Sequence, residues 1–320
     1  MTLPETVPFD RRAIPSAARE SRWAAPGGHA VRRIDWPGAS AHEEPRGSLL
    51  FLPGRGDAYE KYLETLDHWH RLGWQVTALD WRGQAGSGRL AQDSGVGHVG
   101  DFAVWIEDLA AFWAEWAATH PGPRVVVAHS MGGHLALRAL AERRIDPVAV
   151  VLTAPMLGFT APGPRALLHG VAKLMCRIGD PERKAWKISE KPGVGLGSRQ
   201  TLLTHDPERY ADEMAWREQR PELQLGPGSW RWVERAYASF ERLDQPGLLE
   251  TVQTPVLLLA TRADGLVSWR AIERAAKRLP RAQFVLYGKE AAHELLRETD
   301  AVRTRVIRTI DDFLDRLAPG

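Results

Sequence analysis

Cysteine is nearly absent from this chain of 320 residues, in which Cys176 is the only one. A single cysteine cannot form an internal disulfide, and we expect it to be a packed small side chain in a reducing compartment. A large excess of charge of either sign is also missing. The 42 Lys and Arg stand against 40 Asp and Glu, which leaves a net charge of +2. This balance does not indicate a nucleic-acid partner or a strongly anionic ligand.

Long hydrophobic runs are absent as well. The longest apolar stretch, VAVVLTAPMLGF, is interrupted by Pro155 and Gly158, whereas a membrane-spanning helix needs about 20 apolar residues. The chain begins with MTLPETVPFDRR, which has acids and prolines but no apolar centre, so it is unlike a secretory signal. We therefore expect a cytoplasmic protein, and peripheral contact with the inner face of a membrane remains open.

Short apolar runs alternate with helical patterns through most of the chain. Runs such as RVVVAHS are typical of strands buried on both faces, and the segment 102–116 places apolar side chains three and four residues apart, as a helix requires. The expected strands are 48–54, 75–81, 124–130, 148–155, 255–264 and 282–288. Further helices are expected at about 58–71, 131–143, 268–279 and 299–317. The alternation predicts an α/β fold, with a mostly parallel central sheet and helices on both faces.

One long stretch lacks strand patterns. Residues 156–245 contain helical pieces separated by segments rich in glycine and proline. An insertion at this point lies over the carboxyl ends of the strands, where ligands bind in open α/β sheets. We therefore predict a helical cap at 156–245, a core formed by 29–155 and 246–320, and a loosely ordered N-terminal arm at 1–28.

The segment VVVAHSMGGHLALRAL joins a strand pattern to a helical pattern at Ser130. Small residues, Ala128 and Gly132, lie two positions before and after the serine, as a sharp strand-to-helix turn requires. The arrangement matches the nucleophile elbow G-x-S-x-G, with alanine in place of the first glycine. We predict that Ser130 is a nucleophile and that the backbone N–H of Met131, at the amino end of the helix, stabilises an oxyanion. A chance pattern of small residues is the alternative.

A serine hydroxyl needs a base, and the base needs an acid that orients it. His293 follows the last expected strand, and Asp264 ends the strand before it, so both are expected at the sheet edge that carries Ser130. The chain order Ser, Asp, His is the one that accompanies this elbow. His129 and His134 are too close to the serine in sequence to act as its base. A loop or helix-capping role is the alternative for His293 and Asp264.

The second oxyanion donor is expected in the glycine-rich loop that follows the strand 48–54. Glycine allows the backbone to approach a ligand closely. We assign the donor to the backbone N–H of Arg55, with Gly56 as the neighbouring candidate and an ordinary turn as the alternative interpretation.

Several segments of the chain resemble a known family, the lysophospholipase and monoacylglycerol lipase group of the α/β-hydrolase superfamily. The resemblance is carried above all by LPGRGDAYEKY (52–62), DWRGQAGSGR (80–89), AHSMGGHLAL (128–137), TRADGLVS (261–268) and AAHELLRE (291–298). It implies an α/β-hydrolase fold, a triad of Ser130, Asp264 and His293, and oxyanion amides at Arg55 and Met131. Family members often carry His-Gly where this chain has Pro-Gly before Arg55.

Asp80, Arg82 and Gly83 also match the family motif, but they follow the end of an expected strand. A buried bridge between an aspartate and an arginine there would fix the loop. We therefore expect a structural role for Asp80 rather than a catalytic one.

The expected cap contains a helical pattern at 165–180, with an apolar face and interspersed basic residues. Three interpretations stay open for this helix: packing on the core, lining an acyl tunnel, or contact with a membrane surface. We assign Trp230 and Leu157 to the substrate pocket. Trp230 shares a helical face with Tyr237, and core packing is the alternative for these two aromatic residues.

These features predict a serine carboxylester hydrolase that uses neither a cofactor nor a metal and that forms an acyl-enzyme. The expected substrate is a single-chain lipid ester, either a lysophospholipid or a monoacylglycerol. A short-chain esterase, a lactonase or an acyltransferase on the same triad is the alternative, and a lipid-binding protein without turnover is an alternative of another class. No nucleic-acid partner is expected, and the sequence does not fix the oligomeric state.

Overall fold

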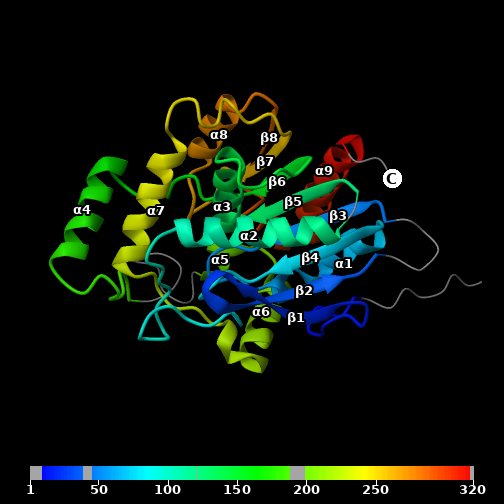
Figure 1. Ribbon diagram of the computed structural model, residues 1–320, viewed down its shortest axis with the longest axis horizontal. Coiled ribbons are helices and arrows are strands. Elements are labelled where there is room, and N and C mark those ends of the chain that lie inside the picture. Colours follow the sequence, from blue (N-terminus) through cyan, green and yellow to red (C-terminus); the bar gives the residue numbers. More distant parts are fainter. Residues whose placement is uncertain (1–8, 39–44, 121, 188–198, 318–320) are drawn as a thin grey trace, which may run out of the picture.

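Eight strands of the described residues form one sheet in a computed structural model of the chain, which describes residues 9–38, 45–120, 122–187 and 199–317 (Figure 1). The strands are β1 (Arg19–Ala25), β2 (His29–Trp36), β3 (Gly47–Leu52), β4 (Trp74–Leu79), β5 (Arg124–His129), β6 (Ala149–Thr153), β7 (Val256–Thr261) and β8 (Ala282–Tyr287). Their order across the sheet is β1-β2-β4-β3-β5-β6-β7-β8, and all neighbours from β4 to β8 are parallel. The predicted fold class, an α/β-hydrolase fold with a mostly parallel sheet, is confirmed.

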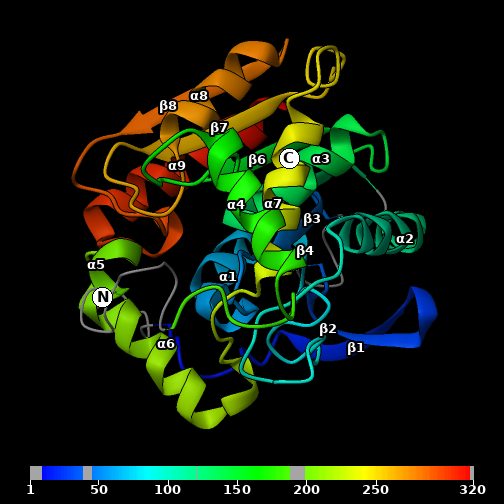
Figure 2. The same cartoon turned by 90° about the vertical axis from the view of Figure 1, so that its left-hand side faces the viewer.

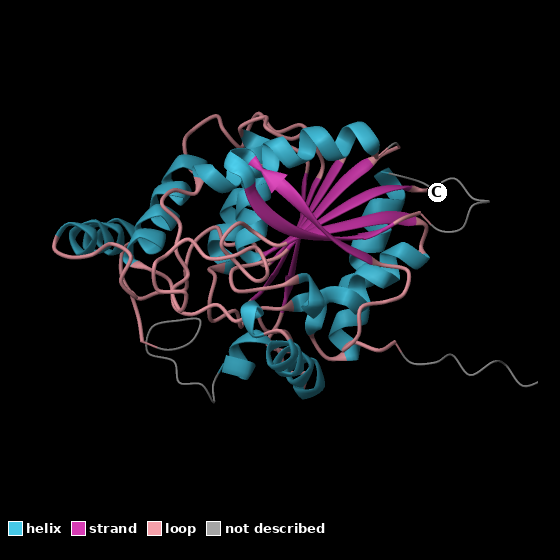
Figure 3. Cartoon of the chain, turned by 60° about the horizontal axis from the view of Figure 1, so that its bottom comes forward, coloured by secondary structure: helices cyan, strands magenta, loops and turns pink. Residues whose placement is uncertain are grey.

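Helices cover both faces of the sheet because the central strands are apolar on both faces (Figure 3). In β5, Val125 and Val127 pack into the cluster that includes α1 (Leu63–Arg71) and α9 (Asp300–Leu317). Val126 and Ala128 point the other way. They join the cluster that includes α2 (Ala103–Thr119), α3 (Ser130–Ala141) and α8 (Trp269–Arg278).

The first two strands were not predicted, and part of the expected N-terminal arm, 1–28, is a strand. β1 pairs antiparallel with β2, and β2 pairs antiparallel with β4. β1 lies at the edge of the sheet and buries only Trp23 and Ala25, so its sequence, RESRWAA, contains no apolar run. Residues 1–8 lie outside the described part of the chain. The prediction of a loosely ordered arm is therefore wrong for Arg19–Ala25, which forms β1.

Four α-helices of the described residues lie in the insertion between β6 and β7. They are α4 (Arg165–Arg177), α5 (Arg199–Leu203), α6 (Pro207–Gln219) and α7 (Trp230–Leu243). α4 and α7 lie side by side at one end of the molecule, whereas α5 and α6 lie apart from them (Figures 1 and 2). Part of the glycine-rich segment of the expected cap, 188–198, is outside the described residues.

Short 3-10 helices connect the larger elements: η1 (Pro26–Gly28), η2 (Tyr59–Tyr62), η4 (Pro221–Leu223) and η5 (Leu295–Arg297). In the part of the chain that the structure describes, no helix combines the length and the apolar character that crossing a bilayer requires.

Candidate active site

Ser130 lies at a sharp turn between β5 and α3. Its φ angle is +51°, a left-handed conformation that non-glycine residues rarely adopt and that is typical of strained functional positions. Gly132 explains the need for a small residue after the serine. A Cβ atom at this position would lie 2.4 Å from the carbonyl oxygen of Pro53 and 2.5 Å from that of Leu52. The first turn of α3 therefore packs directly on the backbone at the end of β3.

The structure brings the three predicted side chains together at the carboxyl edge of the sheet. The Nε2 atom of His293 lies 3.0 Å from the Oγ atom of Ser130, and its Nδ1 atom lies 2.7 Å from Oδ2 of Asp264. Asp264 is held in turn by the backbone N–H groups of Leu266 and Val267, which both donate to Oδ1. These contacts favour the tautomer with the proton on Nδ1, which leaves Nε2 free to accept the proton of the serine.

The imidazole of His293 is buried. Burial by itself would lower the pKa of His293, but the charge of Asp264 and the hydrogen bond to it outweigh burial, so the pKa is raised above its usual value. The ring of His129 lies 4.8 Å from that of His293, centroid to centroid. Burial lowers the pKa of His129 to about 4, so at neutral pH this neighbour carries no charge that would oppose the imidazolium of His293.

The remaining histidine near the elbow has a different environment. The Nε2 atom of His134 lies 2.6 Å from Oγ of Ser239, and burial lowers the pKa of His134 to about 3. Neither geometry nor charge suits His134 as the base of Ser130, in agreement with the sequence argument.

The loop after β3 lies against the serine. A Cβ atom at Gly54 would be 3.1 Å from the Cβ atom of Ser130. The N–H of Gly56 donates to Oε1 of Gln84 at 2.7 Å, so this amide already has a partner, which favours Arg55 over Gly56 as the oxyanion donor. Met131 lies in the first turn of α3, where backbone N–H groups have no carbonyl partner within the helix. The positions of both assigned amides are therefore compatible with an oxyanion site beside Ser130.

A cavity of about 450 Å³ opens beside Ser130 and His293. Its wall is mostly apolar, and the residues that form this part are Met156, Phe159, Ala161, Pro162, Leu168, Ala185, Trp186, Leu203, Trp230, Trp232, Val233, Tyr237, Leu266 and Val267. Asp57, Lys61, Arg199 and Glu294 line another part of the same cavity. The cavity therefore offers an apolar region and a charged region to a single ligand.

The two pocket residues assigned from the sequence have different outcomes. Trp230 lines the cavity. Leu157 does not: among the described residues, Met156 and Phe159 form the wall at this point, and Leu157 packs in the hydrophobic core. The turn after β6 explains the error, because Ala154 has a φ angle of +45° and the alternation of the strand ends there.

A buried bridge between aspartate and arginine does form at the end of β4, but its partners differ from those that the local motif suggested. Oδ2 of Asp80 accepts a hydrogen bond from Nε of Arg32, at 2.6 Å, and Arg32 belongs to the unpredicted strand β2. Arg82 forms two hydrogen bonds to Asp108 of α2. The structure therefore supports a structural role for Asp80, as expected.

Sequence reasoning missed a set of charged residues around the site. The side chains of Asp57, Lys61 and Glu294 are all buried. Asp57 and Lys61 lie in the segment that follows Arg55, and Glu294 follows His293 directly. A charged residue in a loop looks exposed in a sequence. The only signal was that Asp57 and Lys61 fall within the same segment, 52–62, as Arg55.

Most of this chain is similar to known proteins. The family model described as serine aminopeptidase, S33, matches residues 43–300. Lysophospholipase L2 of Escherichia coli strain K12 is 31% identical over 278 residues, which cover 84% of this chain and 80% of that protein. A monoacylglycerol lipase of Mycolicibacterium smegmatis is 27% identical over 60% of this chain and 67% of its own length.

Solved structures show the same fold. A soluble variant of monoglyceride lipase from Saccharomyces cerevisiae, in complex with a substrate analog, superposes with a TM-score of 0.76 at 19% identity. The alignment covers 98% of this chain and all of the yeast protein. The family model spans most of the chain, and the lysophospholipase L2 match extends over most of both proteins. The chain therefore belongs to the serine aminopeptidase S33 family of α/β-hydrolase-fold proteins and is a serine hydrolase.

Proposed function

We propose that the protein hydrolyses single-chain lipid esters, lysophospholipids or monoacylglycerols, through an acyl-enzyme on Ser130. The Oγ atom of Ser130 attacks the ester carbonyl carbon while Nε2 of His293 takes the hydroxyl proton, and Asp264 stabilises the imidazolium. The backbone N–H groups of Arg55 and Met131 hold the oxyanion. His293 then gives its proton to the leaving alcohol. In the second half, a water molecule that loses a proton to His293 attacks the acyl carbon. The bond between the acyl carbon and Oγ then breaks, His293 returns the proton to Oγ, and the carboxylic acid is released, which regenerates Ser130 and the neutral imidazole.

A single observation carries the choice of a lipid ester: the hydroxyl of Ser130 faces a cavity of about 450 Å³ whose wall is largely aromatic and aliphatic. An acyl chain bound there removes apolar surface from water on both sides. An acetyl group would leave most of this wall uncovered, which argues against a short-chain esterase. The similarity to a lysophospholipase and a monoacylglycerol lipase supports the same substrate class.

The dependence of activity on acyl length tests this proposal. Each methylene buried in the cavity contributes ~0.8 kcal/mol, so we expect kcat/KM to rise by more than about 10-fold from acetyl to octanoyl esters. Initial rates on p-nitrophenyl esters, each below its critical micelle concentration, give the comparison. A higher kcat/KM for acetyl than for octanoyl would contradict a lipid-ester substrate.

We further propose that α4–α7 and the loops between them act as a cap, within the boundaries 156–245, and that α4 contacts a lipid surface at the inner face of a membrane. Leu167, Val171, Leu174 and Ile178 are 62%, 43%, 54% and 65% exposed, and they recur at spacings of four, three and four along one helical face. Lys173 and Arg177 are exposed in the same helix. An apolar stripe with basic neighbours fits an anionic membrane surface.

Removing two of these side chains tests the contact. In the double variant Leu174→Ser/Ile178→Ser we expect binding to phosphatidylglycerol vesicles to fall by about 10-fold or more, because partial burial of each side chain in lipid contributes ~1 kcal/mol or more. Vesicle sedimentation measures the binding. Leu72→Ser is the matched control, since Leu72 is 42% exposed at the end of α1, outside the insertion. Equal loss of binding in both variants would contradict a specific role for α4.

A further inference from the structure

A buried lysine connects the two loops that carry the proposed machinery. Lys61 lies in η2, and its side chain is 5% exposed. Its ammonium pairs with a carboxylate oxygen of Asp57, with Oε1 of Glu294 at 2.5 Å, and with Oε2 of Glu213 at 3.4 Å. An ammonium has three N–H donors. Two carboxylates, those of Asp57 and Glu294, accept hydrogen bonds from it, and Glu213 adds a longer ion pair.

One of these partners holds the backbone beside Arg55. Oδ2 of Asp57 accepts the N–H of Gly54 at 3.1 Å and the hydroxyl hydrogen of Tyr62 at 2.8 Å. On the other side of Arg55, the N–H of Gly56 donates to Gln84. Side chains therefore fix the backbone amides on both sides of Arg55. On the Gly54 side, the carboxylate that fixes the amide is that of Asp57, and Lys61 holds this carboxylate in place.

The other partner lies next to the base. Glu294 follows His293 directly in the chain, and its second oxygen pairs with Arg297. Burial by itself would raise the pKa of Glu294, but the charges of Lys61 and Arg297 outweigh it and lower this pKa, so the carboxylate stays ionised. The cluster therefore consists of true ion pairs.

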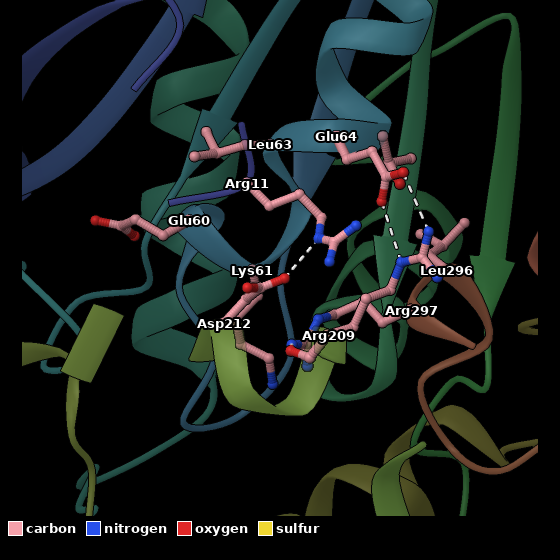
Figure 4. Close-up of a pocket in the computed structure, with 10 residues that line it drawn as sticks. Arg11, Glu60, Lys61, Leu63, Glu64, Arg209, Asp212, Leu296 and Arg297 are labelled. Atoms are coloured by element: carbon pink, nitrogen blue, oxygen red, sulfur yellow. Dashed lines mark hydrogen bonds and ion pairs between the residues drawn. The ribbon is translucent and has the colours of Figure 1, made fainter. Parts of the chain in front are cut away.

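A second cavity, which Lys61 also lines, has a volume of only about 10 Å³, room for about one water molecule (Figure 4). Ion pairs lie around it: Arg11 pairs with Asp212, and Arg209 pairs with Glu64. Lys61 also lines the charged region of the large cavity, but its ammonium is already paired with three carboxylates. It is therefore better placed to fix the groups around it than to bind a substrate headgroup.

We propose that Lys61 is a positioning residue. It holds Asp57 against the N–H of Gly54, and it thereby fixes the position of the loop that contains Arg55 relative to the loop that contains His293. The inference rests on the proposed hydrolase function of Ser130. A displacement of about 1 Å at an active site is enough to slow the chemical step by up to about 100-fold. The acyl chain, in contrast, is proposed to bind in the apolar region of the cavity and not in the charged region that Asp57 and Lys61 line. Lys61 therefore acts on kcat more than on KM.

The charge of Lys61 also affects the pKa of His293, and therefore the pH dependence of kcat/KM. A purely structural role of Lys61 would leave this pH dependence unchanged. The groups facing His293 are Asp264, Glu294, Asp57 and the neutral His129. Asp57 and Glu294 favour the imidazolium, and Lys61 offsets them. Without Lys61 the pKa of His293 rises, the base is protonated up to a higher pH, and the acid limb of the kcat/KM profile moves to higher pH.

The variant Lys61→Met tests the proposal on a soluble octanoyl ester between pH 5 and 9. We expect kcat to fall by about 10- to 30-fold, KM to stay within about threefold, and the acid limb to move upward. Lys61→Arg keeps the charge and should restore kcat and the acid limb in large part. Arg278→Met removes an arginine at the end of α8 that pairs with Asp244 and Glu250 rather than with a residue of either loop, and it should leave both unchanged.

Other outcomes have defined meanings. A folded Lys61→Met protein with kcat within threefold of wild type and an unmoved acid limb overturns the proposal. If Lys61→Met does not fold, Asp57→Asn replaces it, because this change breaks the same link with almost no change of shape; an unchanged kcat in Asp57→Asn is equally contradictory. A wild-type protein that neither cleaves the ester nor reacts with a fluorophosphonate refutes the proposed function itself, and this inference with it.

Discussion

Replacing Ser130 with alanine is expected to lower kcat by about 10⁴-fold or more, because no other group in the site can form the acyl-enzyme. The Oγ atom is the only nucleophile that contacts Nε2 of His293 among the described residues, at 3.0 Å. The oxyanion amides remain in the variant, so a small residual rate above the uncatalysed reaction should persist. Steady-state kinetics and labelling by a fluorophosphonate measure the loss.

The control for this change is a serine outside the site. Ser94 is exposed in the loop before α2, and Ser94→Ala should retain both turnover and labelling at Ser130. Circular dichroism should show the same fold for both variants, since Ser130→Ala removes a hydroxyl and relieves none of the close packing at Gly132. Near-normal ester hydrolysis by folded Ser130→Ala protein would remove the basis of the proposed mechanism.

The site was predictable where local chemistry and chain order restrict the choices. A strand pattern, a small residue, a serine and a glycine leave few conformations other than an elbow at Ser130. Asp264 and His293 follow strands that pair side by side, so the parallel topology alone brings them to the same edge as the serine. The central strands were predictable for a related reason, since burial on both faces requires a continuous apolar run.

The residues that were missed depend on contacts between distant parts of the chain. Arg32 and Asp80 pair across 48 positions, and Lys61 and Glu294 across 233. No local pattern shows that a charged residue will meet its partner after folding. The edge strand β1 was missed for another reason: its two buried side chains are too few to produce a pattern. Sequence alone thus identifies the reacting groups more readily than the groups that hold them in place.

A methyl group at Gly132 is expected to damage the site without removing any reacting group. In Gly132→Ala, the new Cβ atom would lie 2.4 Å and 2.5 Å from two backbone carbonyl oxygens at the end of β3, and backbone atoms cannot move aside as a flexible side chain could. The end of β3 and the start of α3 must separate, and these segments lead to the amides of Arg55 and Met131. We expect kcat to fall by about 100-fold or more and stability to fall by ~1–3 kcal/mol.

The glycine in α4 provides a matched control for this variant. A Cβ atom at Gly170 has no neighbour within 4 Å and lies in a helix, so Gly170→Ala should be neutral or should stabilise the protein by ~0.5–1 kcal/mol, with unchanged kcat on a soluble ester. Thermal unfolding gives the stability of both variants, and the rate of fluorophosphonate labelling tests whether Ser130 is still activated. If folded Gly132→Ala protein keeps wild-type kcat, the contact between the ends of β3 and α3 does not set the oxyanion geometry, and the close packing at Gly132 serves the fold alone.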